Sequence, residues 1–215
     1  MKTPLSACLL TALLAAPLLA ADLEPTLGQK GRLLLEEKFE GEAVPKGWTK
    51  NVGVLAVSAG ALRASQRASD NHAAAFRRAL PVQDCAIQVD FKFAGATTFH
   101  LGFDPAPGEL RKQGHLFSLV VTPTQWSVLE HPDKADPNGK NVVRAKAAAA
   151  FPRDQWHTLL LEVKGDAVVA RVDGREALRA SAKDFHVKKP GLVFRVMGKD
   201  GEAMLFDNVK VWELK

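Results

Sequence analysis

Short segments with alternating apolar and polar residues, separated by turn residues, fill the chain from Leu33 onward. Residues 87–93 place Ile, Val, Phe and Phe at alternate positions, and residues 99–104 repeat the alternation with Phe, Leu and Phe. A period of two is typical of a strand with one buried face. Both segments are therefore predicted to be half-buried strands. Residues 116–121 are apolar at both parities, which predicts a strand covered on both faces.

Turn signals divide these segments into hairpins. Residues 54–57 and 61–64 flank a Ser-Ala-Gly turn, and residues 156–163 and 167–172 flank Lys-Gly-Asp. The next turn, Asp173-Gly174, is a dipeptide that favours positive φ. The sequence therefore predicts antiparallel pairing between neighbouring strands.

The rest of the chain fits the same architecture. Residues 33–39, 191–197 and 203–214 also have the composition of strands, whereas residues 145–150 suit a helical turn that Pro152 ends. About twelve short strands without a long amphipathic helix predict an all-β domain, either a sandwich or a barrel. No internal repeat or second domain is indicated.

The N-terminal segment, residues 1–21, has the three parts of a secretory signal peptide: a lysine, an uncharged Leu/Ala run and two closing alanines. A retained membrane anchor is the alternative, but Pro17 interrupts the run, which is short for a bilayer core that needs about 20 residues. We therefore expect residues 22–32 to lead into one domain, residues 33–215, without a membrane span after cleavage. The expected location is the bacterial periplasm or the exterior of the cell.

Cysteine content and net charge limit the disulfides and the binding partners that the chain can have. Cleavage leaves Cys85 as the only cysteine, so an internal disulfide is excluded and a buried thiol is expected. The formal net charge of +5 becomes +4 without Lys2, and the basic residues are scattered. No run has the length of a nucleic-acid-binding arm, so no nucleic-acid partner is expected. Mild basicity suits an acidic glycan or cell-envelope polymer without requiring one.

Three short motifs carry a family resemblance. Residues 39–48 read Phe-Glu-Gly followed by Pro-x-Gly-Trp, residues 155–159 read Gln-Trp-His-Thr-Leu, and residues 205–211 read Leu-Phe-Asp-Asn-Val-Lys-Val. Together they resemble concanavalin A-like sandwich domains of the laminin G and glucanase type, nearest to exported bacterial 3-keto-disaccharide hydrolase-like domains. The resemblance implies a two-sheet antiparallel jelly-roll sandwich whose concave face holds sugar, with a carbohydrate or cell-envelope glycan as the partner.

The chain departs from the glucanase pattern at the catalytic acids. Family-16 glucanases carry Glu-x-Asp-x-Glu on one strand, whereas the most acidic strand here has Asp90 followed by Lys92. A retaining glycosidase needs two carboxyl groups about 5–5.5 Å apart. Hydrolysis by a carboxylate pair is therefore not indicated.

Polar residues at alternate strand positions are candidates for sugar binding. Asp90 and Lys92 share one face of their strand, His100 and Asp104 share a face of the next, and Arg195 points away from its apolar neighbours. If these strands are neighbours in the concave sheet, the side chains line one groove. The alternative is that they form the solvated side of a sheet.

A long polar loop, residues 104–114, adds further candidates because such loops often carry binding sites. It contains Arg111 and ends beside His115. His131 lies beyond the next strands, and Trp126 follows a turn, where it is either a stacking platform or a packed side chain.

Metal binding is not predicted, because no two histidines have ligand spacing. The oxygen-rich residues 133–139 and Asp207 would suit calcium, but a hairpin turn and a strand bulge explain the same residues. We expect no cofactor, with calcium as the open alternative.

Two functions remain open. The first is a carbohydrate-binding or carbohydrate-processing domain of the keto-sugar type, either a hydrolase or a lyase if it is an enzyme. A general base beside the sugar carbonyl would then be needed, and His100, Asp104 and His115 are the candidates. The second is a non-catalytic cell-envelope interaction or scaffold module. The expected binding residues are Asp90, Lys92, Arg111, Trp126, His131 and Arg195.

Overall fold

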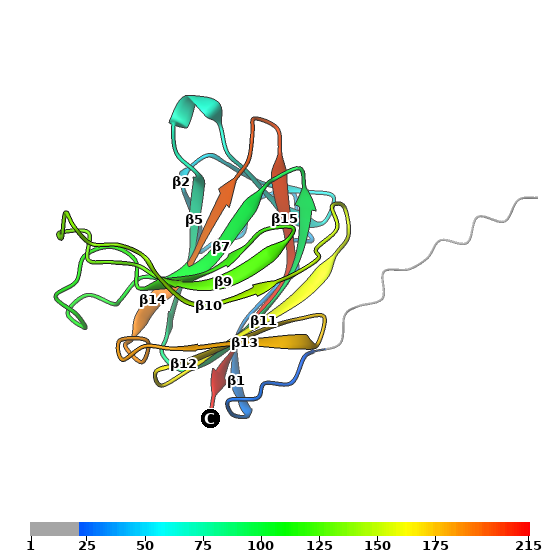
Figure 1. The fold of residues 1–215 in the computed structure, drawn as a ribbon. Coiled ribbons are helices and arrows are strands. Elements are labelled where there is room, and N and C mark those ends of the chain that lie inside the picture. The colour runs from blue at the N-terminus through cyan, green and yellow to red at the C-terminus, as the bar shows by residue number, and fades with distance from the viewer. Residues whose placement is uncertain (1–21) are drawn as a thin grey trace, which may run out of the picture.

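Two antiparallel β-sheets packed face to face form the protein (Figure 1). The computed structural model describes residues 22–215, so the predicted signal peptide, residues 1–21, lies outside the described residues. The described part contains fifteen strands and one short 3-10 turn, and none of its helices is long and apolar enough to cross a membrane. The all-β, two-sheet prediction is confirmed.

The eight-stranded sheet has the order β13-β12-β11-β6-β15-β4-β3, and β1 also pairs with β15. Its strands are β1 (Lys30–Glu37), β3 (Val54–Ser58), β4 (Ala61–Ser65), β6 (Cys85–Ala94), β11 (His157–Lys164), β12 (Ala167–Val172), β13 (Arg175–Ser181) and β15 (Ala203–Leu214).

The seven-stranded sheet has the order β10-β9-β8-β7-β14-β5-β2. Its strands are β2 (Trp48–Val52), β5 (Ala74–Val82), β7 (Thr98–Phe103), β8 (Phe117–Val121), β9 (Gln125–Glu130), β10 (Val142–Ala148) and β14 (Lys189–Met197). Figure 1 shows that this sheet twists strongly between β2 at one edge and β10 at the other.

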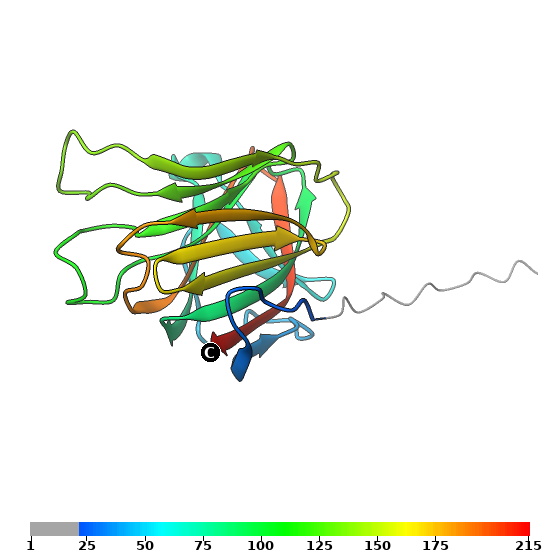
Figure 2. The same ribbon diagram turned by 60° about the horizontal axis from the view of Figure 1, so that its bottom comes forward.

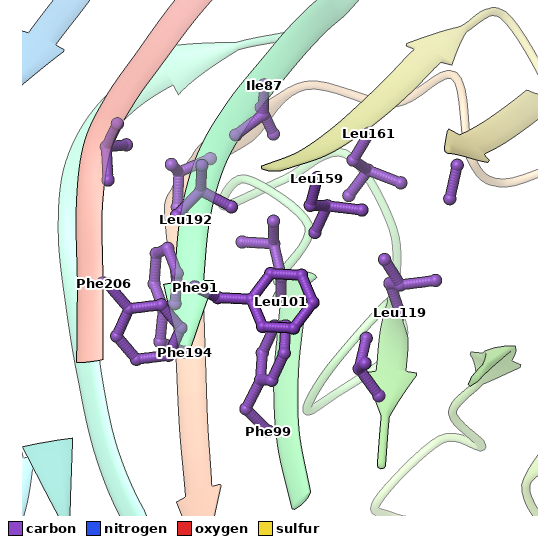
Figure 3. Close-up of a cluster of buried hydrophobic side chains, with 14 of the residues drawn as sticks. Ile87, Phe91, Phe99, Leu101, Leu119, Leu159, Leu161, Leu192, Phe194 and Phe206 are labelled. Carbon is purple, nitrogen blue, oxygen red and sulfur yellow. The ribbon is translucent and has the colours of Figure 1, made fainter. Parts of the chain in front are cut away.

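The core fills the space between the sheets. Phe91 and Leu159 from the eight-stranded sheet meet Phe99, Leu101 and Phe194 from the seven-stranded sheet (Figure 3), and all five are fully buried. Each such side chain contributes roughly 1.5–3 kcal/mol by leaving water. The alternation in the sequence therefore marks the inward face of each strand.

Two predicted hairpins are confirmed in their turn geometry. Ala59 and Gly60 have φ of 51° and 72° between β3 and β4. Asp173 and Gly174 have φ of 53° and 69° between β12 and β13. Two successive positive φ values match the right-handed twist of the flanking strands.

Two local predictions are wrong. Residues 145–150 do not form a helical turn, because residues 145–148 belong to β10 and pair with β9. The two strands predicted at 87–93 and 99–104 are buried on both faces rather than half-buried: Gln88 is 1% exposed, Asp90 8% and His100 7%. Periodicity alone could not reveal the groups that cover these polar side chains.

The segment before β1 covers the outer face of the eight-stranded sheet. The backbone N–H groups of Thr26 and Leu27 donate to Glu162 Oε2 at 2.6 and 2.7 Å, and that of Leu23 donates to Gln88 Oε1 at 2.8 Å. Residues 30–32 of the predicted leader already belong to β1. This face is therefore partly closed by the chain itself.

Two long loops project together from one end of the molecule (Figures 1 and 2). They follow β7 and β9, and backbone hydrogen bonds join them: His131 N donates to Leu116 O at 3.1 Å and Lys134 N to Gln113 O at 3.0 Å. The pairing holds the loop residues beside the end of the seven-stranded sheet.

Candidate functional site

Polar side chains gather on the outer face of the seven-stranded sheet. In β7, Phe99 and Leu101 point into the core, so His100, Gly102 and the following Asp104 face outward. Arg195 of β14 lies directly opposite His100 in the strand pairing. His100 and Arg195 therefore share this face, as the sequence pattern predicts.

Two adjoining pockets hollow this face, with volumes of about 460 and 580 Å³. We call them together the outer groove. Its residues are Asn51, Val52, His72, Ala75, Arg77, His115, Val193 and Arg195 in the first pocket, and Gln66, Asn71, His72, Ala73, Thr97, Arg195, Met197, Gly198 and Lys199 in the second. His72 and Arg195 line both pockets, so the groove is continuous at these residues.

A hydrogen-bonded chain of side chains borders the groove. Asp104 Oδ1 lies 2.5 Å from His115 Nδ1, and Asp104 Oδ2 accepts from Arg77 Nη2 at 3.1 Å. Arg77 also donates to Asn51 Oδ1 at 2.7 Å. Burial alone would raise the pKa of Asp104, but His115 and Arg77 outweigh it, so the pKa lies below its usual value. Asp104 is therefore ionised at neutral pH and orients His115.

Two further histidines lie on this face, and both are neutral at physiological pH. Burial, with help from the charge of Arg195, lowers the pKa of His100 to about 3. Burial and the nearby His115 lower the pKa of His131 to about 4. The rings of His115 and His131 are 5.4 Å apart.

A glycine makes room for the contact that holds His131. Ser118 Oγ lies 2.9 Å from His131 Nε2, and Asn141 Oδ1 lies 3.1 Å from Nδ1. A Cβ atom on Gly102 would lie only 2.4 Å from Ser118 Oγ. Glycine at this position therefore lets β8 bring Ser118 under the histidine.

The chain contains three His–Asp pairs among its described residues, at 2.5–2.8 Å. In one pair a buried His157, packed against Phe91, meets the exposed Asp173, and in another both His186 and Asp166 are exposed. Only His115, in the Asp104 pair, lines the outer groove. All six residues are visible in the sequence, but the sequence does not indicate which of the three pairs lies beside the groove.

Asp90 and Lys92 do not join this groove. They belong to β6 and face outward from the eight-stranded sheet, on the opposite side of the sandwich. Asp90 accepts hydrogen bonds from Thr158 at 2.6 Å and Asn208 at 2.8 Å, whereas Lys92 lies over the ring of Trp156. Strand parity identified an outward face correctly but could not assign the strand to a sheet.

Trp126 and Arg111 also lie away from the groove. Trp126 is 3% exposed and points into the core side of β9, where it packs edge-on against Phe151. Arg111 is exposed on the loop after β7 and lines neither pocket of the groove.

The oxygen-rich loop is explained by its own backbone. Asp133 Oδ1 accepts from the N–H groups of Gln113 and Ala135, and Asp136 Oδ1 accepts from that of Asn138. Within residues 22–215, no group of three or more His, Cys, Asp or Glu side chains is placed to hold a metal ion. Asp207 lies at a bulge in β15, beside Asn208 with a φ of 48°.

Sequence reasoning missed Arg77, Asn51 and Ser118. Arg77 was visible only as part of a basic pair, yet Ala74 and Phe76 are buried on the core side of β5. Alternation from Phe76 would have placed Arg77 outward. Asn51 and Ser118 carry no comparable signal, because their roles depend on strands that pair far along the sequence.

Solved structures share this architecture. The carbohydrate-binding module CBM66 from Bacillus subtilis has a TM-score of 0.62 and 16% identity, with 78% of this chain and 96% of that chain covered. A non-specific endo-β-1,3(4)-glucanase of family GH16 has a TM-score of 0.62 and 16% identity, with 86% and 91% covered. A Bacillus subtilis protein of unknown function with a galectin-like fold has a TM-score of 0.61 and 15% identity, with 86% and 98% covered.

This chain has the concanavalin A-like fold. The resemblance seen in the sequence motifs is thereby confirmed for the fold. No protein-family model matches the chain, and no curated protein matches it. What the sandwich does must therefore be argued from the outer groove itself.

Among the described residues, neither pocket of the groove is lined by a carboxylate. Asp104 is held behind Arg77 and His115 rather than paired with a second acid. The groove thus lacks the two carboxyl groups that a retaining glycosidase needs. Its chemistry is that of guanidinium, amide and imidazole groups.

Proposed function

We propose that the outer groove of this sandwich is a carbohydrate-binding site. The observation that carries the proposal is that Arg77, Arg195, Asn51 and His115 together line one continuous hollow. Guanidinium and amide groups make paired, planar hydrogen bonds, which suit adjacent sugar hydroxyls. The likeness to a carbohydrate-binding module and a glucanase supports the same proposal.

Binding of oligosaccharides to the purified residues 22–215 tests this proposal on a glycan array. Arg77→Ala should weaken binding about tenfold or more, because it removes charge-assisted hydrogen bonds. Arg179→Ala is the matched control, since Arg179 is exposed on the other sheet. Retention of every glycan by the Arg77 variant at unchanged affinity would contradict the proposal.

The Asp104–His115 pair supports a second, finer proposal, cleavage of a keto-sugar glycoside. His115 Nδ1 is held by Asp104, so Nε2 is the ring nitrogen left for a substrate. As a general base it would take the proton on the carbon between the sugar carbonyl and the anomeric carbon. The electron pair forms a carbon–carbon double bond, the glycosidic C–O bond breaks, and the leaving oxygen is protonated.

Turnover of a 3-keto-disaccharide tests this step. His115→Ala should lower kcat about 10²- to 10⁴-fold, because general-base catalysis contributes that factor. His186→Ala is the matched control, since it breaks an exposed His–Asp pair outside the groove. Glycan binding without turnover in the unmodified protein would instead support a non-catalytic cell-envelope module.

We also propose that the protein acts outside the cytoplasm, in the periplasm or as a secreted protein, with a cell-envelope glycan as partner. The signal-like pattern of residues 1–21 supports this location. Expression of the full chain in a bacterium, followed by fractionation and N-terminal sequencing, should give a mature protein that begins near residue 22. Uncleaved protein in the cytoplasm would contradict it.

A further inference from the structure

We propose that the outer groove selects acidic sugars, and that Arg195 recognises their carboxylate or sulfate-ester group. This inference rests on the proposed carbohydrate site and names the class of sugar that it takes. The shared chemistry is a negatively charged substituent on an oligosaccharide.

Among residues 22–215, Arg195 has no counter-ion. Its strand neighbours are His100 on one side and Ala75 on the other, and neither carries a negative charge. Within residues 22–215, no carboxylate lies within ion-pair distance of its guanidinium, and its buried Nε has no hydrogen-bond partner. Buried polar groups are normally paired, so the protein itself leaves the guanidinium of Arg195 incompletely satisfied.

The groove around Arg195 is also positive overall. Arg77 lines the first pocket with Asp104 behind it, and Lys199 lines the second pocket beside Arg195. Among the residues described, no acid lines either pocket. The acids next to the lining, Asp104 and Glu202, already accept hydrogen bonds from Arg77 and from the backbone N–H of Lys199.

Arg195 is also partly buried, which affects the free energy of its positive charge. Burial lowers the pKa of Arg195, because the surrounding protein removes water from the guanidinium without supplying a negative charge in its place. A partly desolvated cation costs free energy until an anion pairs with it. His100, opposite Arg195 in the neighbouring strand, is neutral at physiological pH, so it adds no second charge.

The test is calorimetric binding of paired oligosaccharides to residues 22–215. Each acidic oligosaccharide is compared with a neutral oligosaccharide of the same backbone. One set of acidic oligosaccharides carries uronate carboxylates and the other carries sulfate esters. Inorganic sulfate alone is measured as a further ligand. At least one acidic member should bind roughly tenfold or more tightly than its neutral partner, because charged hydrogen bonds are the stronger ones. The two acidic sets distinguish carboxylate from sulfate recognition.

Arg195→Gln should abolish the preference, and Arg195→Lys should restore part of it by keeping the charge. Arg179→Gln, a charge loss on the other sheet, should leave the preference unchanged, and circular dichroism confirms folding of each variant. Equal or tighter binding of all neutral partners would overturn the inference while leaving the carbohydrate site intact. Inorganic sulfate that binds as tightly as the sulfated sugars would overturn it as well. Failure of every oligosaccharide to bind would overturn the proposed function itself.

Discussion

At the scale of single residues, buried ionisable side chains make stability depend on pH. Burial lowers the pKa of His100 to about 3 and that of His131 to about 4. Below pH 6.5 the unfolded chain therefore binds protons that the folded chain refuses, so stability falls as the pH falls. Asp207 acts in the opposite direction, because burial raises its pKa to about 6 and its protonation favours the folded state.

We predict that His100→Gln reduces the loss of folding free energy that occurs as the pH falls. Between pH 7 and pH 4.5, His100 should account for about 2 kcal/mol of the decline in the free energy of unfolding. Denaturant titrations of the wild type and the variant at both pH values measure the difference. His186→Gln is the control, since His186 is exposed. An identical decline in wild type and His100→Gln would mean that His100 is charged in the folded protein.

At the scale of elements, the segment before β1 closes one face of the sandwich through a buried carboxylate. Glu162 is fully buried and accepts from the backbone of Thr26 and Leu27, with Arg171 3.3 Å from its other oxygen. This contact could not be predicted from the sequence, because residues 22–29 lack periodicity and Glu162 is far along the chain.

Glu162→Ala should therefore lower the free energy of unfolding by about 3 kcal/mol, because it leaves two backbone amides without their acceptor and removes the carboxylate beside the half-buried Arg171. Thermal or urea unfolding measures the loss. Glu24→Ala, which breaks an exposed ion pair with Lys30, should cost less than about 1 kcal/mol. Equal stability of both variants would show that the segment is not held by Glu162.

The elements also show what a single sequence can and cannot specify. Alternation placed Phe91 and Phe99 in the core and His100 outward, because side-chain direction follows from local strand geometry. It could not place β6 and β7 in different sheets, because that depends on pairing between distant strands. This is why Asp90 and His100, both outward, lie on opposite faces of the molecule.

At the scale of the whole molecule, the reactivity of one thiol measures unfolding of the sandwich. Cys85 is fully buried at the start of β6, and burial raises its pKa to about 12. The reactive thiolate is therefore nearly absent in the folded state.

We predict that a thiol reagent labels Cys85 in residues 22–215 only as fast as the domain unfolds. Labelling rates measured against denaturant concentration should follow the unfolding transition seen by circular dichroism. Cys85→Ala provides the unlabelled control. Rapid labelling in native buffer would show that β6 opens locally without global unfolding.

The residue before β1 and the C-terminal residue lie side by side at one edge of the sandwich. Gln29 and Lys215 exchange two backbone hydrogen bonds, at 3.0 and 2.9 Å, and residues 22–29 lie over the eight-stranded sheet. The outer groove lies on the opposite sheet. An affinity tag or a biosensor linker attached at either position would leave the molecule on the side away from the groove. Immobilised in that orientation, the protein would present its groove to glycans in solution.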